Sequence, residues 1–137
     1  MANNAIAAVE PVEFTDYFIE ENGVTFAGRH LLIDIWGAEH LTDIDYIEQA
    51  LRQAADAASA PVLSVHLHQF SDSGGVSGVA ILAESHISIH TWPERDYAAL
   101  DVFMCGACNP HNALPILKSA FNAKSVTANE TRRGVVA

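Results

Sequence analysis

The chain has 137 residues, half of them hydrophobic, and a formal net charge of −10. This length predicts one domain with a real hydrophobic core, and no apolar run approaches the roughly 18 residues that a membrane-spanning helix needs. The acidic balance argues against a nucleic-acid partner, which requires a basic surface, and suits a small cationic substrate.

The N-terminal segment and the cysteines indicate a cellular location. Residues 1–14 have neither a positive start nor a long apolar stretch, so we expect no signal peptide. Two cysteines in such a chain predict free thiols in a reducing compartment, the cytoplasm. Residues 1–27 are acidic and weakly periodic, and we interpret them as an N-terminal extension before a domain over residues 28–137.

The first part of this domain predicts a strand, a helix and a second strand. Residues 30–36 are almost all apolar, which is typical of a buried strand. Residues 44–58 carry apolar side chains at helical spacing after a capping Thr42 or Asp43, and predict a helix. Residues 62–70 alternate between apolar and polar side chains, as expected for a strand with one wet face.

The second part predicts further strands and one more helix. A loop is expected over residues 71–75, which are serine, aspartate and glycine. The pair Asn109-Pro110 is typical of a capping residue followed by the first residue of a helix, and a short final strand is expected near Val126. Three strand segments lie between the loop and this helix, at residues 79–83, 86–91 and 98–104.

This order of elements favours an α+β fold, a two-layer α/β sandwich with a mainly antiparallel sheet. The helices would cover one face of the sheet. The uncovered face would carry apolar side chains, so we expect it to pack against a second copy of the chain.

The densest group of reactive side chains lies in residues 83–94, which read AESHISIHTWPE. Alternation along a strand places His86, Ser88 and His90 on one face of this segment. An edge strand with a polar face would have the same pattern, so no single histidine here indicates a function by itself.

Four segments taken together resemble the pyruvoyl-dependent S-adenosylmethionine decarboxylase proenzymes of bacteria and archaea. They are GRHLLIDIWG at 28–37, GVSGVAIL at 75–82, AESHISIHTWPE at 83–94 and YAALDVFMCG at 97–106. The resemblance implies that the chain cuts itself between Glu84 and Ser85, giving a chain of residues 1–84 and a chain of residues 85–137. The product would be a cytoplasmic lyase that supplies aminopropyl groups for spermidine biosynthesis.

The same resemblance assigns roles to four side chains. Ser85 attacks the carbonyl before it and ends as a covalent pyruvoyl group, the cofactor, which forms a Schiff base with the substrate amine and withdraws electrons. His90 accepts the α-proton of Ser85 during processing, and Ser77 assists. Cys105 donates a proton to the substrate after CO₂ has left.

Two further residues would bind the substrate. Phe70 matches a residue that stacks on adenine, although a phenylalanine at the end of a strand can also be a core residue. Glu94 matches a carboxylate that holds the ribose hydroxyls. The loop after Phe70, SDSGGVSG, is one residue longer than is usual in the family. A pyruvoyl-dependent ornithine or arginine decarboxylase therefore stays open as the alternative, and a non-catalytic relative is a third possibility.

Ser85 and His90 have opposite parity on an extended strand. A bend or strained turn near Ser85 is therefore required to bring the two side chains together. The resemblance also implies a homodimer of processed protomers, an α/β/β/α four-layer sandwich with the sheets face to face and the active sites near the interface.

Two other motifs are set aside. Cys105 and Cys108 form a CxxC pair but lack the strand–helix context of a thioredoxin-like redox site. Nothing in the spacing of the histidines forces three or four ligands together, so we expect no metal.

Overall fold

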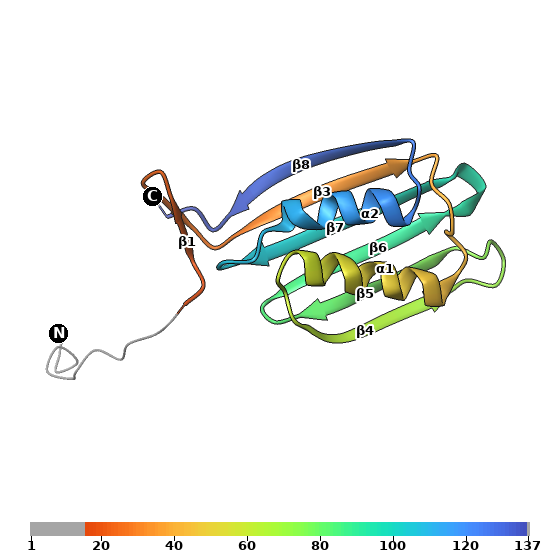
Figure 1. Cartoon of the computed structure of the whole chain (residues 1–137), viewed down its shortest axis with the longest axis horizontal. Coiled ribbons are helices and arrows are strands. Elements are labelled where there is room, and N and C mark those ends of the chain that lie inside the picture. Colours follow the sequence, from red (N-terminus) through yellow and green to blue (C-terminus); the bar gives the residue numbers. More distant parts are fainter. Residues whose placement is uncertain (1–15, 137) are drawn as a thin grey trace, which may run out of the picture.

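The structure of the chain, a computed structural model, describes residues 16–136. Two helices lie against one face of a six-stranded sheet, and a small hairpin lies at one end of it (Figure 1). The hairpin is β1 (Ile19–Glu21) and β2 (Val24–Phe26), and the helices are α1 (Ile44–Ala57), α2 (Ala113–Ala120) and the short 3₁₀ turns η2 (Pro93–Arg95) and η3 (Pro110–Asn112). The sheet contains β3 (Gly28–Trp36), β4 (Val62–Gln69), β5 (Val76–Leu82), β6 (Ser85–Trp92), β7 (Tyr97–Cys105) and β8 (Ser125–Arg133).

The strands lie in the order β4-β5-β6-β7-β3-β8, and every neighbouring pair is antiparallel. The predicted α+β fold, with helices on one face of an antiparallel sheet, is confirmed. Among residues 16–136, no helix is long and apolar enough to cross a membrane.

Helix α1 begins and packs as its sequence predicts. Asp43, rather than Thr42, caps it by accepting a hydrogen bond from the Tyr46 amide at 3.1 Å. This contact satisfies one of the amides left free in the first helical turn. The buried stripe of α1 then packs on the sheet through Ile47, Ala50, Leu51, Ala54 and Ala55.

Two predicted elements differ from the structure. Asn109 does act as a cap, since its side chain accepts from the His111 amide, but the residues from Pro110 to Asn112 form a 3₁₀ turn before α2 begins. The final strand is nine residues long rather than short. It is an edge strand with a mostly exposed, polar sequence, so its length is set by pairing with β3 rather than by an apolar pattern.

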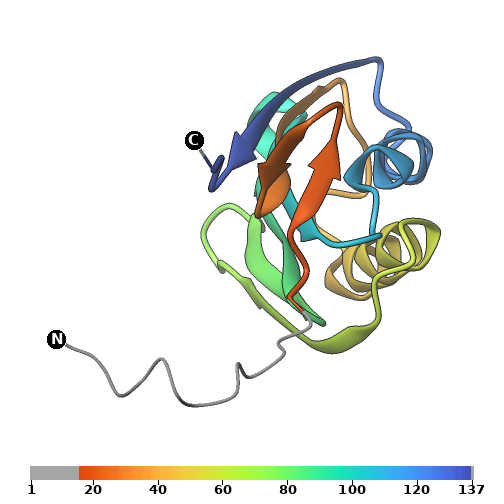
Figure 2. The ribbon, with the colours of Figure 1, turned by 90° about the vertical axis from the view of Figure 1, so that its left-hand side faces the viewer.

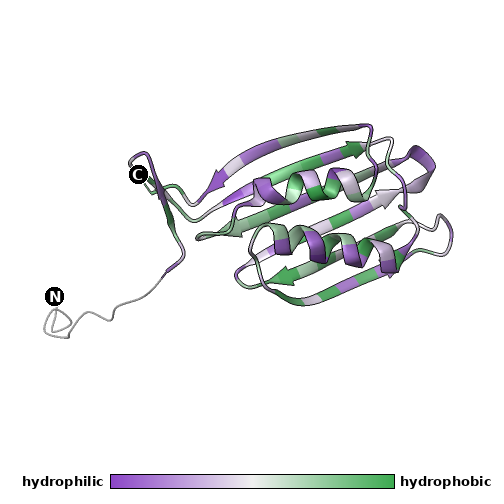
Figure 3. Ribbon diagram, in the orientation of Figure 1, coloured by the Kyte–Doolittle hydropathy of each residue, from purple (hydrophilic) through white to green (hydrophobic). Residues whose placement is uncertain are grey.

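The hydrophobic core lies between the sheet and the helices. Apolar side chains of the strands and helices meet there. In Figure 3, green hydrophobic stretches recur along the strands and on both helices. The fully buried members include Leu31, Ile33 and Ile35 of β3, Ile87 and Ile89 of β6, Val102 and Met104 of β7, and Leu117 and Phe121 at the second helix.

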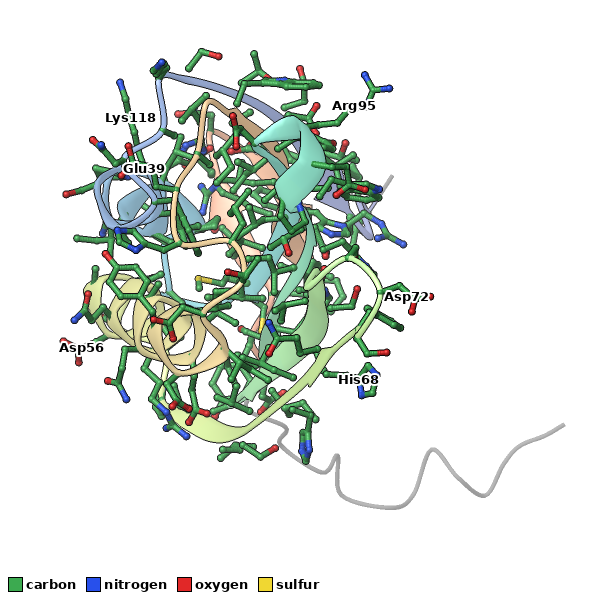
Figure 4. All side chains as sticks on the ribbon, turned by 90° about the vertical axis from the view of Figure 1, so that its right-hand side faces the viewer. Glu39, Asp56, His68, Asp72, Arg95 and Lys118 are labelled. Carbon is green, nitrogen blue, oxygen red and sulfur yellow. The ribbon has the colours of Figure 1, made fainter. Side chains whose placement is uncertain are left out.

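Among residues 16–136, no helix covers the other face of the sheet, as the end-on view in Figure 2 shows. It exposes large apolar side chains, among them Leu32, Trp36, Ile81 and Trp92. Figure 4, from the opposite end, labels His68 on the side away from the helices. Exposed apolar surface of this kind is typical of an interface, and packing against a second copy stays a prediction.

The N-terminal segment is partly built into the domain. Residues 16–27, which the sequence analysis places in an extension, include the β1–β2 hairpin, and Phe26 is fully buried. Residues 1–15 lie outside the described residues. The domain boundary at residue 28 stays a prediction.

Candidate active site

The bond between Glu84 and Ser85 lies at the tightest turn of the sheet. Strand β5 ends at Leu82 and β6 begins at Ser85, so Ala83 and Glu84 alone connect the two strands. Glu84 has a φ of 59°, in the left-handed region. A side chain in this region costs roughly 1–2 kcal/mol, and such strain is found at functional sites.

The Ser85 hydroxyl is buried and has no hydrogen bond of normal geometry within residues 16–136, although it lies near enough to the Cys105 thiol to lower the pKa of that thiol. A buried hydroxyl without a partner destabilises the fold by about 1–3 kcal/mol. The position therefore keeps a serine at the expense of stability, which suits a nucleophile held next to the carbonyl it attacks.

The Cys105 thiol contacts the peptide bond between Glu84 and Ser85. Its Sγ donates a hydrogen bond of 3.0 Å to the carbonyl oxygen of Glu84. Burial raises the pKa of this thiol; the neighbouring Ser85 hydroxyl opposes the rise, and the Glu84 carboxylate adds to it. Cys105 therefore stays protonated at neutral pH and can donate a hydrogen bond or a proton.

Ser77 and His90 form a second group. They face each other across β5 and β6, and Ser77 Oγ lies 3.0 Å from His90 Nδ1. His90 is five residues beyond Ser85 along one strand, which places it about 17 Å away. The turn at Glu84 is present, but it does not bring His90 to Ser85 within one chain.

Phe70 and Glu94 lie at the His90 end of the sheet. Phe70 follows β4, is 49% exposed and packs edge-on against His68, so the interpretation of Phe70 as a core residue is wrong. Glu94 lies in η2, directly after β6, and is exposed. Both side chains are free to contact a ligand.

The predicted residues thus fall into two groups at opposite ends of β6. We call Glu84, Ser85 and Cys105 the cleavage group, and Phe70, Ser77, His90 and Glu94 the base group. Neither group contains all the residues that the predicted chemistry needs.

Between the two groups lies a polar cluster that sequence reasoning missed. Asp101 of β7 accepts hydrogen bonds from three side chains on the uncovered face: His30 Nε2 at 2.5 Å, His86 Nε2 at 2.8 Å and the Ser88 hydroxyl. Arg133 Nη1 lies 3.2 Å from His30 Nδ1. These residues come from four strands, so only the strand register could have grouped them.

The cluster has the composition of a metal site, since ligand atoms of His30, His86 and Asp101 lie within 4.8 Å of one another. Its hydrogen bonds indicate otherwise. Arginine can only donate, so His30 Nδ1 must accept, and the ring proton is then on Nε2, facing Asp101. In this tautomer the Nε2 lone pair of His30 is not available to a metal, and His30, His86, Ser88 and Asp101 form a hydrogen-bond network.

We expect this network to stabilise the fold only above acidic pH. Burial raises the pKa of Asp101, but hydrogen bonds from Ser88, His30 and His86 outweigh it and lower the pKa overall. The stabilisation is therefore present above the unfolded pKa of about 3.9 and is lost as pH falls through the lower folded pKa.

The melting temperatures of the parent and of Asp101→Asn should therefore differ at pH 7, and the gap should narrow as the pH falls to 3. Asp72→Asn, in an exposed loop, is the matched control and should follow the parent at both pH values. A gap between parent and Asp101→Asn that is equally large at pH 3 would contradict the role of the carboxylate.

Comparisons with known proteins place these residues in a family context. The family model described as S-adenosylmethionine decarboxylase matches residues 29–134. A proenzyme of this name from Thermomicrobium roseum is 40% identical over 110 residues, which cover 80% of this chain and 95% of the relative. One from Clostridium kluyveri is 48% identical over 111 residues, covering 79% of this chain and 87% of the relative. The crystal structure of the adenosylmethionine decarboxylase from Aquifex aeolicus superposes with a TM-score of 0.70 at 34% identity, covering 82% of this chain and 94% of that one.

Proposed function

The chain belongs to the S-adenosylmethionine decarboxylase family, and on this premise we propose that it is a self-cleaving proenzyme whose processed form decarboxylates S-adenosylmethionine. One observation carries the proposal. A strained turn presents the Glu84 carbonyl to the Cys105 thiol, while the Ser85 hydroxyl next to it has no partner within residues 16–136.

The cleavage begins with the Ser85 hydroxyl. Its oxygen adds to the carbonyl carbon of Glu84, and Cys105 donates a hydrogen bond to the oxygen on which charge develops. The carbon–nitrogen bond then breaks, the nitrogen takes up the hydroxyl proton, and Glu84 is held as an ester on Ser85. Relief of the left-handed strain at Glu84 favours this step.

The ester is then eliminated. A base removes the α-proton of residue 85, the Glu84 carboxylate departs with the former hydroxyl oxygen, and residue 85 becomes dehydroalanine. After tautomerisation to an imine, one water replaces the nitrogen, which leaves as ammonia, and the pyruvoyl group remains. The unpartnered hydroxyl and the adjacent thiol proton fit the formation of this group at residue 85.

His90 is the base in this scheme, and it must come from another chain because it is about 17 Å from Ser85 along its own strand. Ser77, His90 and Cys105 all belong to the uncovered face or its rim. A two-fold axis that lies between two stacked sheets, perpendicular to their strands, would place the cleavage group of one protomer opposite the base group of its partner. The proposed working unit is therefore a homodimer in which His90 of the partner subunit takes the α-proton.

The pyruvoyl group supplies an electron sink for the decarboxylation. Cys105 holds its proton at Sγ beside residue 85, since its pKa is raised by burial. Phe70 and Glu94 of the partner subunit would face the same site, where an aromatic ring and a carboxylate can bind an adenine and a ribose. The net charge of −10 favours the approach of a sulfonium cation.

The substrate is tested by release of labelled CO₂ from S-adenosylmethionine, ornithine and arginine, each given to the processed protein. We expect CO₂ from S-adenosylmethionine alone, because the relatives that match most of the chain carry its name. Release from ornithine or arginine alone would overturn the substrate and leave the processing chemistry. A fully cleaved protein that releases no CO₂ from any of them would overturn the activity.

Substitution of Cys105 should separate its two tasks. Serine keeps a hydrogen-bond donor for the Glu84 carbonyl but is a far weaker acid, so Cys105→Ser should cleave and then decarboxylate about 100-fold or more slowly. Alanine removes the donor as well, so Cys105→Ala should also cleave about 100-fold more slowly. Cleavage is followed by gel electrophoresis and turnover by CO₂ release. Cys108→Ser is the control, because its thiol donates to the Ser59 carbonyl instead. Full turnover in Cys105→Ser would contradict the proton-donor role.

A further inference from the structure

The N-terminal arm, residues 16–27, lies at the end of the sheet where the cleavage group is found. Figure 2 shows the hairpin in front of this end. The arm precedes residue 29, where the match to the family model begins. Its role therefore has to be inferred from its own contacts.

The arm is firmly anchored. The Phe26 ring is fully buried, with the guanidinium carbons of Arg29 and Arg132 at 5.4 and 4.6 Å from its centroid. The Glu21 carboxylate accepts hydrogen bonds of 2.5 Å from both arginines. Two backbone bonds add to this, from the Ala27 amide to the Arg133 carbonyl and from the Val136 amide to the Thr25 carbonyl. The arm is thus held by the sheet rather than loosely attached.

Tyr17 connects the arm to Gly106, the residue directly after Cys105. Its carbonyl accepts a hydrogen bond of 2.7 Å from the Gly106 amide, directly after Cys105. Gly106 has a φ of +62°, and a Cβ atom there would lie 3.1 Å from the Tyr17 ring. A side chain at residue 106 would be strained by the left-handed backbone and would crowd the Tyr17 ring.

Two cavities meet at Tyr17. One has a volume of about 390 Å³ and the other about 270 Å³, and both are lined by Tyr17, Glu84 and Cys105. The larger cavity is bounded by the arm through Asp16 and Phe18. The arm is therefore a wall of the space around the bond that is cut.

We propose that Tyr17 is a positioning residue of this site: its carbonyl fixes the turn after Cys105, and its ring separates the thiol from bulk water. The inference rests on the proposed function in one respect, namely that Cys105 is a proton donor. The position of the ring supports it, since Tyr17 lines both of the cavities that Cys105 lines.

The test measures the thiol itself and does not depend on enzymatic activity. Ser85→Ala combined with Cys108→Ser gives an uncut chain with a single cysteine, and its rate of alkylation by iodoacetamide is followed at neutral pH by mass spectrometry. Adding Tyr17→Ala should raise this rate about tenfold, because exposure lowers the pKa of the thiol and opens it to the reagent. Adding Tyr17→Phe should leave the rate near that of the background.

Phe18→Ala is the matched control, because Phe18 is 46% exposed and Tyr17 49%, on the same arm, and Phe18 lines only the larger cavity. Its alkylation rate should stay within about twofold of the background. An unchanged rate in Tyr17→Ala, or an equal rise in Phe18→Ala, would overturn the proposal. A protein that never cuts or decarboxylates would contradict the proposed function and leave this result standing.

Discussion

The Ser85→Ala protein is expected to remain a single chain of 137 residues, while the parent is cut. Alanine has no oxygen to add to the Glu84 carbonyl, and the strain of the turn cannot break an amide without a nucleophile. The loss should be complete on electrophoresis over days of incubation. Ser88→Ala is the control: its hydroxyl is on the same strand but bonds Asp101 on the uncovered face, and this variant should still be cut.

The same substitution should not destabilise the fold. It removes a buried hydroxyl that has no partner within residues 16–136, so the melting temperature of Ser85→Ala should be equal to or above that of an uncut parent. A Ser85→Ala protein that is cut would show that another group is the nucleophile. One that is uncut but largely unfolded would show that the hydroxyl has a structural partner.

Complementation between two inactive variants is expected to restore cleavage. Ser85→Ala and His90→Ala should each stay uncut when expressed alone. When they are expressed together, each mixed dimer has one site with Ser85 from the His90→Ala chain and His90 from the Ser85→Ala chain. With random pairing, about half of the His90→Ala chains should be cut and none of the Ser85→Ala chains. Tags of different mass distinguish the two.

The control for this experiment is His90→Ala expressed with the double variant Ser85→Ala/His90→Ala, in which no His90 is present and no chain should be cut. If Ser85 and His90 acted within one chain, neither combination would yield any cut product. Cleavage of His90→Ala when it is expressed by itself would show instead that another base suffices.

The regular parts of the fold were predictable because their patterns are local. Helix α1 has its cap and apolar stripe in adjacent residues, β3 contains a nearly continuous apolar run, and β6 alternates between apolar and polar side chains. Strand β8 has neither, since it is a polar edge strand whose extent is fixed by β3. The arm was missed for a similar reason: its main apolar anchor, Phe26, is held by Arg132, which is distant in sequence.

The arrangement of the candidate site could not be predicted from the sequence. The motif around Ser85 predicts which residues react, and the parity of Ser85 and His90 indicates a turn nearby. Parity shows on which faces of a strand the two side chains lie, but not how far apart they are. The turn lies at Glu84, whereas His90 lies at the far end of β6 from Ser85. Asp101 and its histidine partners depend on three-strand register, which no local pattern encodes.

The most direct test of the account is the intact mass of the purified, unmodified protein. We predict two polypeptides, residues 1–84 ending in a free carboxylate and a second chain beginning with a pyruvoyl group in place of Ser85, which blocks N-terminal sequencing. A peptide that spans Glu84 and Ser85 in full amount, from a preparation that releases CO₂ at its maximal rate, would contradict the account.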